Sequence, residues 1–270
     1  MLNFPMLERI KIYLDYFCKA ETIYNIHPPF LYDFIDFIFD KERIYYDFNT
    51  LQEASESLKR KHTIIPIEPF SVSHHQNNLS ISQLYNKAGH SNSDYECLYR
   101  IALHLKSKKI LELGSCVGMS GLTLALACKH GKTLTIEGNN FLSDSCNELF
   151  HQFNIKNISC LHSDFGNYLD KSTENYFDLV FLDGDHQYDS TINYLSKLFI
   201  QTTDSAVIIL DDIHWSADMY KAWKETVTHP SVQCSLETER WGFLFKDKLL
   251  TKGAYVYIHK KYKPWKIGLF

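Results

Sequence analysis

The stretch Ile110-Leu-Glu-Leu-Gly-Ser-Cys-Val-Gly-Met-Ser120 carries the clearest indication of fold in this chain. Its first four residues are apolar apart from one glutamate, which predicts a buried strand. Gly114 and Gly118 punctuate the following turn, and a helix is predicted over residues 117–130. A strand that turns directly into a helix is typical of the first half of a β-α-β unit.

The same pattern continues toward the C-terminus. Short apolar runs predict strands at residues 133–136, 158–161, 179–182 and 207–210, with helices at 142–153, 190–200 and 217–228. Gly131 is placed to end the helix before it in a left-handed conformation. Two further strands are expected after Pro230, near 232–236 and at 241–245 or 254–259. This alternation predicts an α/β fold with a mostly parallel, doubly wound sheet.

The segment before Gly89 contains no glycine and has apolar residues at helical spacing. Helices are predicted around residues 7–18, 31–38, 50–60, 80–84 and 94–105, and Thr50 could cap the third of them. The predicted organisation is a helical region over 1–105, followed by a ligand-binding α/β domain over 106–270. The aromatic side chains of the helical region are either core residues or part of a substrate lid or dimerisation surface.

Composition and charge exclude several classes of protein. The 270 residues are 45% hydrophobic and 22% charged, as in an ordinary globular protein, which excludes a disordered or fibrous chain. A formal net charge of −4 argues against a general nucleic-acid binder. The seven cysteines form no CxxC pair, so we expect reduced core thiols. No apolar run resembles a signal peptide or membrane span, and a cytoplasmic protein without a membrane partner is expected.

Polar and acidic side chains follow each predicted strand, where ligands of doubly wound sheets bind. In the first turn, Cys116 occupies the position at which a pyrophosphate site needs its second glycine, which disfavours close approach of a phosphate. Glu112 and Glu137, at the first and second strand ends, instead suggest a cationic amine and a ribose diol as partners. S-adenosylmethionine has both groups and carries no phosphate.

Three carboxylates follow two strands that should be neighbours. Asp183, Asp211 and Asp212 can converge because adjacent strands lie ~4.8 Å apart. Carboxylates without thiolates favour a hard divalent ion such as Mg²⁺. The alternative is that these aspartates orient ligand groups and cap the helices that follow.

Two histidines near these aspartates are candidate general bases. His186 lies three residues beyond Asp183, and His214 lies two residues beyond Asp212. Imidazole is suited to taking up a hydroxyl proton near neutral pH, and it can also ligate a metal. The alternative for each is a structural hydrogen bond. The walls of a substrate pocket are expected from the N-terminal helices and the loop after Trp215.

These motifs resemble those of the class I S-adenosylmethionine-dependent methyltransferases, over residues 108–223. The resemblance is closest to the metal-dependent small-molecule O-methyltransferases of the catechol and caffeoyl-CoA type and their bacterial relatives. It implies a Rossmann-like sheet with a helical N-terminal extension. Residues 110–120 resemble the motif that holds the methionine part of the cofactor, which implies contacts from Gly114, Ser115, Gly118 and Ser120. Thr135-Ile-Glu-Gly138 resembles the ribose-binding strand end, which assigns Glu137 and Gly138 to the cofactor.

The resemblance also implies roles for the later strand ends. Phe177-Asp-Leu-Val-Phe-Leu-Asp183 resembles the strand whose last aspartate binds metal beside the cofactor, and Val207-Ile-Ile-Leu-Asp-Asp212 resembles the strand carrying the remaining metal ligands. Asp164 is expected near the adenine. Many members have a lysine where this chain has His186, the predicted catalytic base.

The implied activity is metal-assisted methyl transfer to a hydroxyl of a small molecule, with Mg²⁺ on the three aspartates. Two alternatives stay open: a protein of this fold that binds the cofactor without catalysis, and a metal-independent N- or protein-methyltransferase. Nothing in the sequence names the methyl acceptor. The oligomeric state is equally open, and a homodimer is one option.

Overall fold

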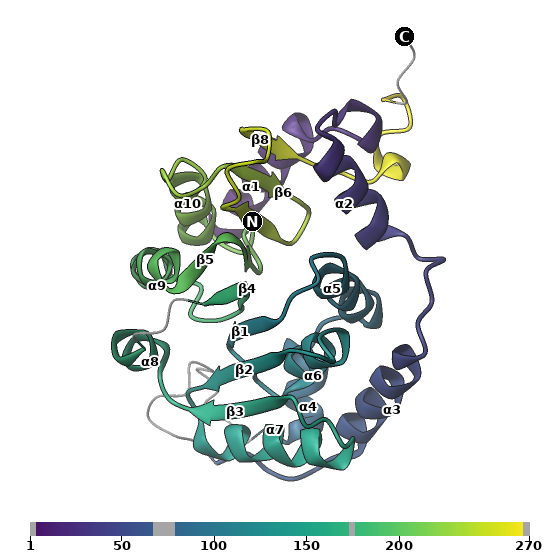
Figure 1. The fold of residues 1–270 in the computed structure, drawn as a ribbon, viewed down its shortest axis with the longest axis vertical. Coiled ribbons are helices and arrows are strands. Elements are labelled where there is room, and N and C mark those ends of the chain that lie inside the picture. The colour runs from purple at the N-terminus through teal and green to yellow at the C-terminus, as the bar shows by residue number, and fades with distance from the viewer. Residues whose placement is uncertain (1–3, 67–78, 173–175, 267–270) are drawn as a thin grey trace. The chain divides into compact units, whose positions relative to one another are not determined.

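The computed structural model describes residues 4–66, 79–172 and 176–266 (Figure 1). They belong to two compact units. The first unit comprises residues 1–36 and 174–270, and the second comprises residues 37–173. The predicted division separates a helical region, residues 1–105, from a ligand-binding domain, residues 106–270. That division stays a prediction.

The second unit contains three parallel strands in the order β3-β2-β1 (Figure 1). They are β1 (Lys109–Leu113), β2 (Lys132–Glu137) and β3 (Ile158–His162). Each lies within one residue of its predicted position. The register places Leu113 beside Ile136 and Glu137 beside His162, so the carboxyl ends of the strands finish at one edge.

The described helices of the second unit are α3 (Asp47–Arg60), α4 (Ile81–Ala88), α5 (Asn92–His104), α6 (Met119–Ala127), α7 (Asn140–Gln152) and α8 (Phe165–Lys171). Ser80 and Ser91 begin α4 and α5 with capping boxes. The prediction that Thr50 caps α3 is wrong, because this helix begins at Asp47 and Thr50 lies inside it. Figure 1 shows α7 along β3, which it contacts.

Gly131, which follows α6, is required for a reason other than the predicted one. Among the described residues the glycines with positive φ are Gly114 and Gly118, so the left-handed conformation predicted for Gly131 is wrong. A Cβ at Gly131 would lie 2.2 Å from the Lys108 carbonyl oxygen and 2.3 Å from Cys128 Sγ. Glycine is needed here because the backbone of the neighbouring segment approaches too closely for any side chain.

The first unit contains five strands in the order β4-β5-β7-β6-β8. They are β4 (Phe177–Leu182), β5 (Thr202–Leu210), β6 (Cys234–Glu237), β7 (Gly242–Phe245) and β8 (Gly253–Val256). β4 and β5 are parallel, and Leu182 pairs with Leu210, so Asp183 and Asp211 follow at adjacent positions. β7 is antiparallel to both β5 and β6. Both segments offered as alternatives for the last strand therefore contain one.

The helices assigned to the first unit are α1 (Phe4–Lys19), α2 (Pro29–Phe39, which extends past residue 36), α9 (Tyr188–Gln201) and α10 (Ala217–Thr226), with short 3-10 turns at Ile23–Asn25 and Lys260–Tyr262. Phe34 of α2 is fully buried and meets the Phe243 and Phe245 rings edge-on. α1 packs against α10 and buries Ile12 and Tyr16.

The described elements confirm the mixed α/β fold class and, because the regular elements between residue 4 and β1 are helices, the helical N-terminal extension. The seven cysteines all lie in the described part of the chain and form no disulfide. Among the described residues, none of the helices combines the length and apolar character needed to cross a membrane.

Candidate functional site

The predicted cofactor turn joins β1 to α6 in the second unit. Gly114 has φ 106° and Gly118 has φ 86°, which is the left-handed region that glycine adopts without strain. Cys116 between them also has a positive φ, of 50°. A Cβ on Gly118 would lie 3.1 Å from Cys146 Sγ, so the turn is closely packed on α7. Ser120 is buried in the first turn of α6.

The Glu137 carboxylate links this turn to the end of β2. The Cys116 backbone N–H donates to its Oε2 at 2.9 Å, and the Asn139 N–H donates to its Oε1 at 3.0 Å. Burial raises the pKa of Glu137, and the backbone hydrogen bonds oppose part of that rise. Each carboxylate oxygen accepts more than one hydrogen bond, so both can also receive hydroxyl groups. Gly138 follows directly, and its carbonyl lies 3.2 Å from His162 Nε2.

A buried polar chain lies below the turn. Glu112 is fully buried, and its Oε2 accepts a hydrogen bond from Thr135 Oγ1. Thr135 Oγ1 is in turn hydrogen-bonded to Ser115 Oγ, which lies 3.4 Å from Cys160 Sγ. These contacts fix the base of the turn. The predicted contacts of Glu112 and Ser115 with the cofactor stay predictions.

Asp164, after β3, caps α8. Its Oδ1 accepts from the Asn167 N–H at 2.8 Å, and its Oδ2 accepts from the Asn167 side-chain amide. The helix α8 was not predicted, although an aspartate at this position is a common start signal for a helix.

The turn, the Glu137 carboxylate and Cys116 at the second glycine position together fit a ribose-bearing cofactor that lacks a phosphate.

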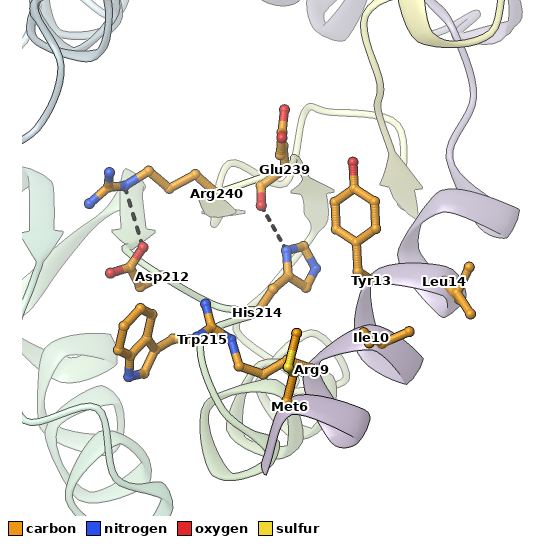
Figure 2. Close-up of a pocket in the computed structure, with 10 residues that line it drawn as sticks. All are labelled: Met6, Arg9, Ile10, Tyr13, Leu14, Asp212, His214, Trp215, Glu239 and Arg240. Atoms are coloured by element: carbon orange, nitrogen blue, oxygen red, sulfur yellow. Dashed lines mark hydrogen bonds and ion pairs between the residues drawn. The ribbon is translucent and has the colours of Figure 1, made fainter. Parts of the chain in front are cut away.

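The acidic cluster lies in the first unit, where Asp183 follows β4 and Asp211 and Asp212 follow β5. Asp211 is fully buried and forms a bidentate ion pair with Arg240. Arg240 Nε donates to Asp211 Oδ1 at 2.7 Å, and Nη2 donates to Oδ2 at 2.8 Å. Arg240 Nε also lies 3.5 Å from Asp212 Oδ1 (Figure 2). Burial lowers the pKa of Arg240, but the bond to Asp211 and the charges of Asp212 and Asp183 raise it by more.

The predicted Mg²⁺ site meets a competing cation in this cluster. Both oxygens of Asp211 are hydrogen-bonded to the guanidinium, and Asp212 faces the same group. Each Asp211 oxygen keeps a second acceptor site, but a Mg²⁺ ion bound there would lie beside the positive charge of Arg240. Arg240 thus competes with a metal ion for Asp211 and Asp212, and metal assistance stays a prediction. Sequence analysis missed Arg240, which is 29 positions from Asp211.

His186, the predicted base, lies between β4 and α9. Its Nε2 is 3.8 Å from Asp183 Oδ1, and its side chain is 30% exposed. Among the described residues its Nδ1 has no hydrogen-bond partner. The Nδ1 atom is buried and Nε2 lies within ion-pair distance of Asp183, so the role of His186 as a base stays a prediction.

His214, the rival base, is engaged at both ring nitrogens. Its Nδ1 lies 2.9 Å from the Glu239 carbonyl oxygen, and its Nε2 lies 3.0 Å from Glu237 Oε1. Both ring nitrogens of His214 are thus engaged by protein oxygens, and its contacts are those of a structural residue.

Glu237 is the buried centre of a second ionic network. Its Oε2 accepts from Trp223 Nε1 at 2.8 Å and from Lys224 Nζ at 3.0 Å, and Oε1 faces His214. Burial raises the pKa of Glu237, but its three donors lower it by more, so the net shift is downward.

The lowered pKa of Glu237 predicts a loss of stability in acid. A carboxyl whose pKa is lower in the folded state stabilises the protein at neutral pH, and that contribution is lost as pH falls. We expect Glu237→Gln to lower the free energy of unfolding by about 1–3 kcal/mol near neutral pH. The deficit should shrink as both proteins are unfolded in urea at progressively lower pH. Glu239→Gln, at an exposed neighbour, is the control, and a deficit that is constant across the pH series would contradict this account.

A cavity of about 760 Å³ lies beside this cluster in the first unit (Figure 2). Met6, Ile10 and Leu14 of α1 form an apolar wall. The Trp215 ring forms another part, with the Arg9 guanidinium 4.3 Å from its centroid. Tyr13, Asp212, His214, Glu239 and Arg240 supply polar groups. The N-terminal helix α1 contributes to this cavity as expected for a substrate pocket, whereas the loop after Trp215 does not line it, and the cavity's role as the substrate pocket stays a prediction.

Comparisons with known proteins bear on the fold and on residues 111–213. Residues 111–213 match the family model described as a methyltransferase domain. No curated protein matches the chain significantly.

Solved structures with the same fold span most of the chain. A Klebsiella pneumoniae protein provisionally assigned as an O-methyltransferase is 15% identical, covers 76% of this chain and 91% of its own, and has a TM-score of 0.56. The Bacillus cereus O-methyltransferase in complex with S-adenosylhomocysteine is 13% identical, covers 77% of this chain and 94% of its own, and has a TM-score of 0.55. The O-methyltransferase of tomaymycin synthesis from Streptomyces achromogenes, in complex with S-adenosylmethionine, is 15% identical. It covers 76% of this chain and 91% of its own, and its TM-score is 0.54.

At these identities the likeness shows the fold, and it confirms the Rossmann-like sheet expected from the sequence. The family match begins within β1 and ends three residues after β5, so it includes the glycine-bearing turn and the acidic cluster. Residues 111–213 therefore match a methyltransferase domain, and the chain has the fold of the S-adenosylmethionine-dependent O-methyltransferases.

Proposed function

We propose that this chain transfers a methyl group from S-adenosylmethionine to a hydroxyl of a small molecule. The proposal rests mainly on the Glu137 carboxylate at the end of β2. This carboxylate accepts a hydrogen bond from the Cys116 N–H in the glycine-bearing turn that follows β1. This joins an acidic acceptor for ribose hydroxyls to a turn unsuited to phosphate. The two solved O-methyltransferases with a bound cofactor or its product support the choice of cofactor.

On the cofactor side, each residue has a distinct role. Glu137 accepts hydrogen bonds from the ribose hydroxyls through oxygens already oriented by two backbone donors. The backbone around Gly114 and Gly118 holds the methionine portion, with Ser120 in the first turn of α6. Asp164 lies at the adenine end, and Gly138 lets the chain turn beside the ribose.

On the acceptor side, His186 takes up the proton of the reacting hydroxyl, and Asp183 orients its imidazole. When bound, S-adenosylmethionine supplies a methyl group on a positively charged sulfur, and its S–C bond breaks as the new C–O bond forms. The cavity lined by α1, Trp215 and Arg240 holds the acceptor, with its apolar part against Met6, Ile10 and Leu14. Orientation of the two reactants supplies much of the rate enhancement.

Calorimetric titration of S-adenosylhomocysteine into the purified protein tests the cofactor assignment. We expect one molecule to bind per chain with a dissociation constant on the order of micromolar. Adenosine diphosphate is the matched control ligand, and it should bind much more weakly because Cys116 blocks a phosphate cradle. Absence of S-adenosylhomocysteine binding would overturn the proposal.

A radiolabelled methyl donor with a panel of hydroxyl-bearing and amine-bearing small molecules then tests the chemistry. We expect the label in an ether or ester product. Label confined to amines or to protein would assign a different acceptor class. Cofactor binding without transfer to any acceptor in the panel would favour a non-catalytic role.

A further inference from the structure

Arg240 lies in the segment that precedes β7, close to the residues that follow β5. β5 and β7 are antiparallel, with Leu210 opposite Gly242, so the residues that follow β5 lie beside those that precede β7. This brings Arg240 next to Asp211 and Asp212. The pairing of the strands therefore places a cation among carboxylates that lie far from it in sequence.

Arg240 is fixed by its own loop as well as by the aspartates. The Ile213 N–H donates to the Arg240 carbonyl oxygen at 3.2 Å, and His214 Nδ1 contacts the Glu239 carbonyl at 2.9 Å. Thr238 and Trp241 close the loop through two further hydrogen bonds, at 2.9 and 3.0 Å. The guanidinium is thus held from two sides, by its backbone and by its ion pair.

Arg240 neutralises the carboxylate of this cluster that is most deeply buried, Asp211. The Asp211 carboxylate is 0% exposed and accepts hydrogen bonds from Nε and Nη2 of the Arg240 guanidinium. A guanidinium does not lose its proton in proteins. A divalent ion at the same carboxylates would have to displace Arg240 or lie against a like charge. Arg240 and Asp212 also line the 760 Å³ cavity, which is large enough for a small molecule (Figure 2).

We propose that Arg240 is the resident cation of this site and takes the place of a divalent metal. The inference rests on the proposed function. Arg240 donates hydrogen bonds to the acceptor oxygen and stabilises the negative charge that develops there as the hydroxyl proton passes to His186. Acceptor binding and methyl transfer then need no metal, which separates this chain from the metal-dependent enzymes that its motifs resemble.

Titration with Mn²⁺, followed by the loss of its free-ion electron paramagnetic resonance signal, tests this assignment. We expect the wild-type protein to bind no Mn²⁺ at concentrations that saturate an ordinary three-carboxylate site. Arg240→Gln should gain one Mn²⁺ site, because the aspartates lose their cation. Asp211→Asn/Arg240→Gln should lose that site again. One tightly bound Mn²⁺ per wild-type chain would overturn the inference, as would Arg240→Gln that folds and gains no site.

The wild-type titration decides the matter even where Arg240→Gln does not fold. S-adenosylhomocysteine binding to wild type, measured in EDTA and again in Mg²⁺, separates this inference from the proposed function. Equal binding in both is the expected result. Failure to bind in either condition counts against the proposed function, whereas Mn²⁺ binding by wild type counts against Arg240 as the resident cation whatever the cofactor result.

Discussion

Glu137→Ala is expected to weaken S-adenosylhomocysteine binding by about 100-fold, because the variant loses charge-assisted hydrogen bonds to the ribose. The Glu137 carboxylate also holds the Cys116 and Asn139 N–H groups, so its removal loosens the turn that receives the methionine portion. Calorimetry on the wild type and the variant measures the ratio of dissociation constants directly.

Two further variants separate binding from folding. Glu137→Gln keeps one carbonyl oxygen and loses the charge, so we expect a loss of about tenfold. Glu148→Ala removes another glutamate of the same unit, one that pairs with Lys61 at the surface, and should leave binding unchanged. Wild-type affinity in a folded Glu137→Ala protein would exclude the carboxylate from the cofactor site.

Arg240→Met is expected to lower the free energy of unfolding by about 3 kcal/mol, because it leaves the fully buried Asp211 carboxylate without its partner. The value is set at the low end of the usual range because the Arg240 side chain is 32% exposed. Urea unfolding of both proteins at neutral pH measures the difference.

The companion variants show whether the buried charge is the cause. Asp211→Asn/Arg240→Met removes both charges and should recover much of the lost stability. Arg43→Met removes one partner of an exposed pair with Asp40 and should cost less than about 1 kcal/mol. Equal, small losses in Arg240→Met and Arg43→Met would show that the Asp211 pair contributes no more than a surface pair.

The sequence by itself determined where the strands of the parallel sheet end, although β5 begins at Thr202 and not at residue 207 as predicted. The apolar runs of β1 to β5 are local patterns, and Glu137 and Asp183 follow from the point at which each run stops. The adjacency of Asp183 and Asp211 also followed, because parallel neighbouring strands end together. Local periodicity and topology were sufficient for these features.

The buried face of a helix was harder to predict from the sequence than the helix itself. Leu7, Ile10 and Leu14 define an apolar stripe on α1, yet Leu14 is 54% exposed and the buried residues are Ile12 and Tyr16. The Tyr16 hydroxyl donates to the Tyr257 carbonyl at 2.7 Å, across 241 positions of sequence. A periodic stripe predicts a helix, but the face that is buried depends on which distant segments pack against it.

Only the tertiary structure decided how the charges of the candidate site are balanced. Three aspartates at strand ends predict a cation, and a metal is the natural choice while no other partner is visible. The antiparallel return of β7 beside β5 brings Arg240 to Asp211, and the Glu237 and Glu239 contacts occupy both nitrogens of His214. Ion pairs depend on distance in space, which local sequence patterns do not encode when the partners lie on separate loops.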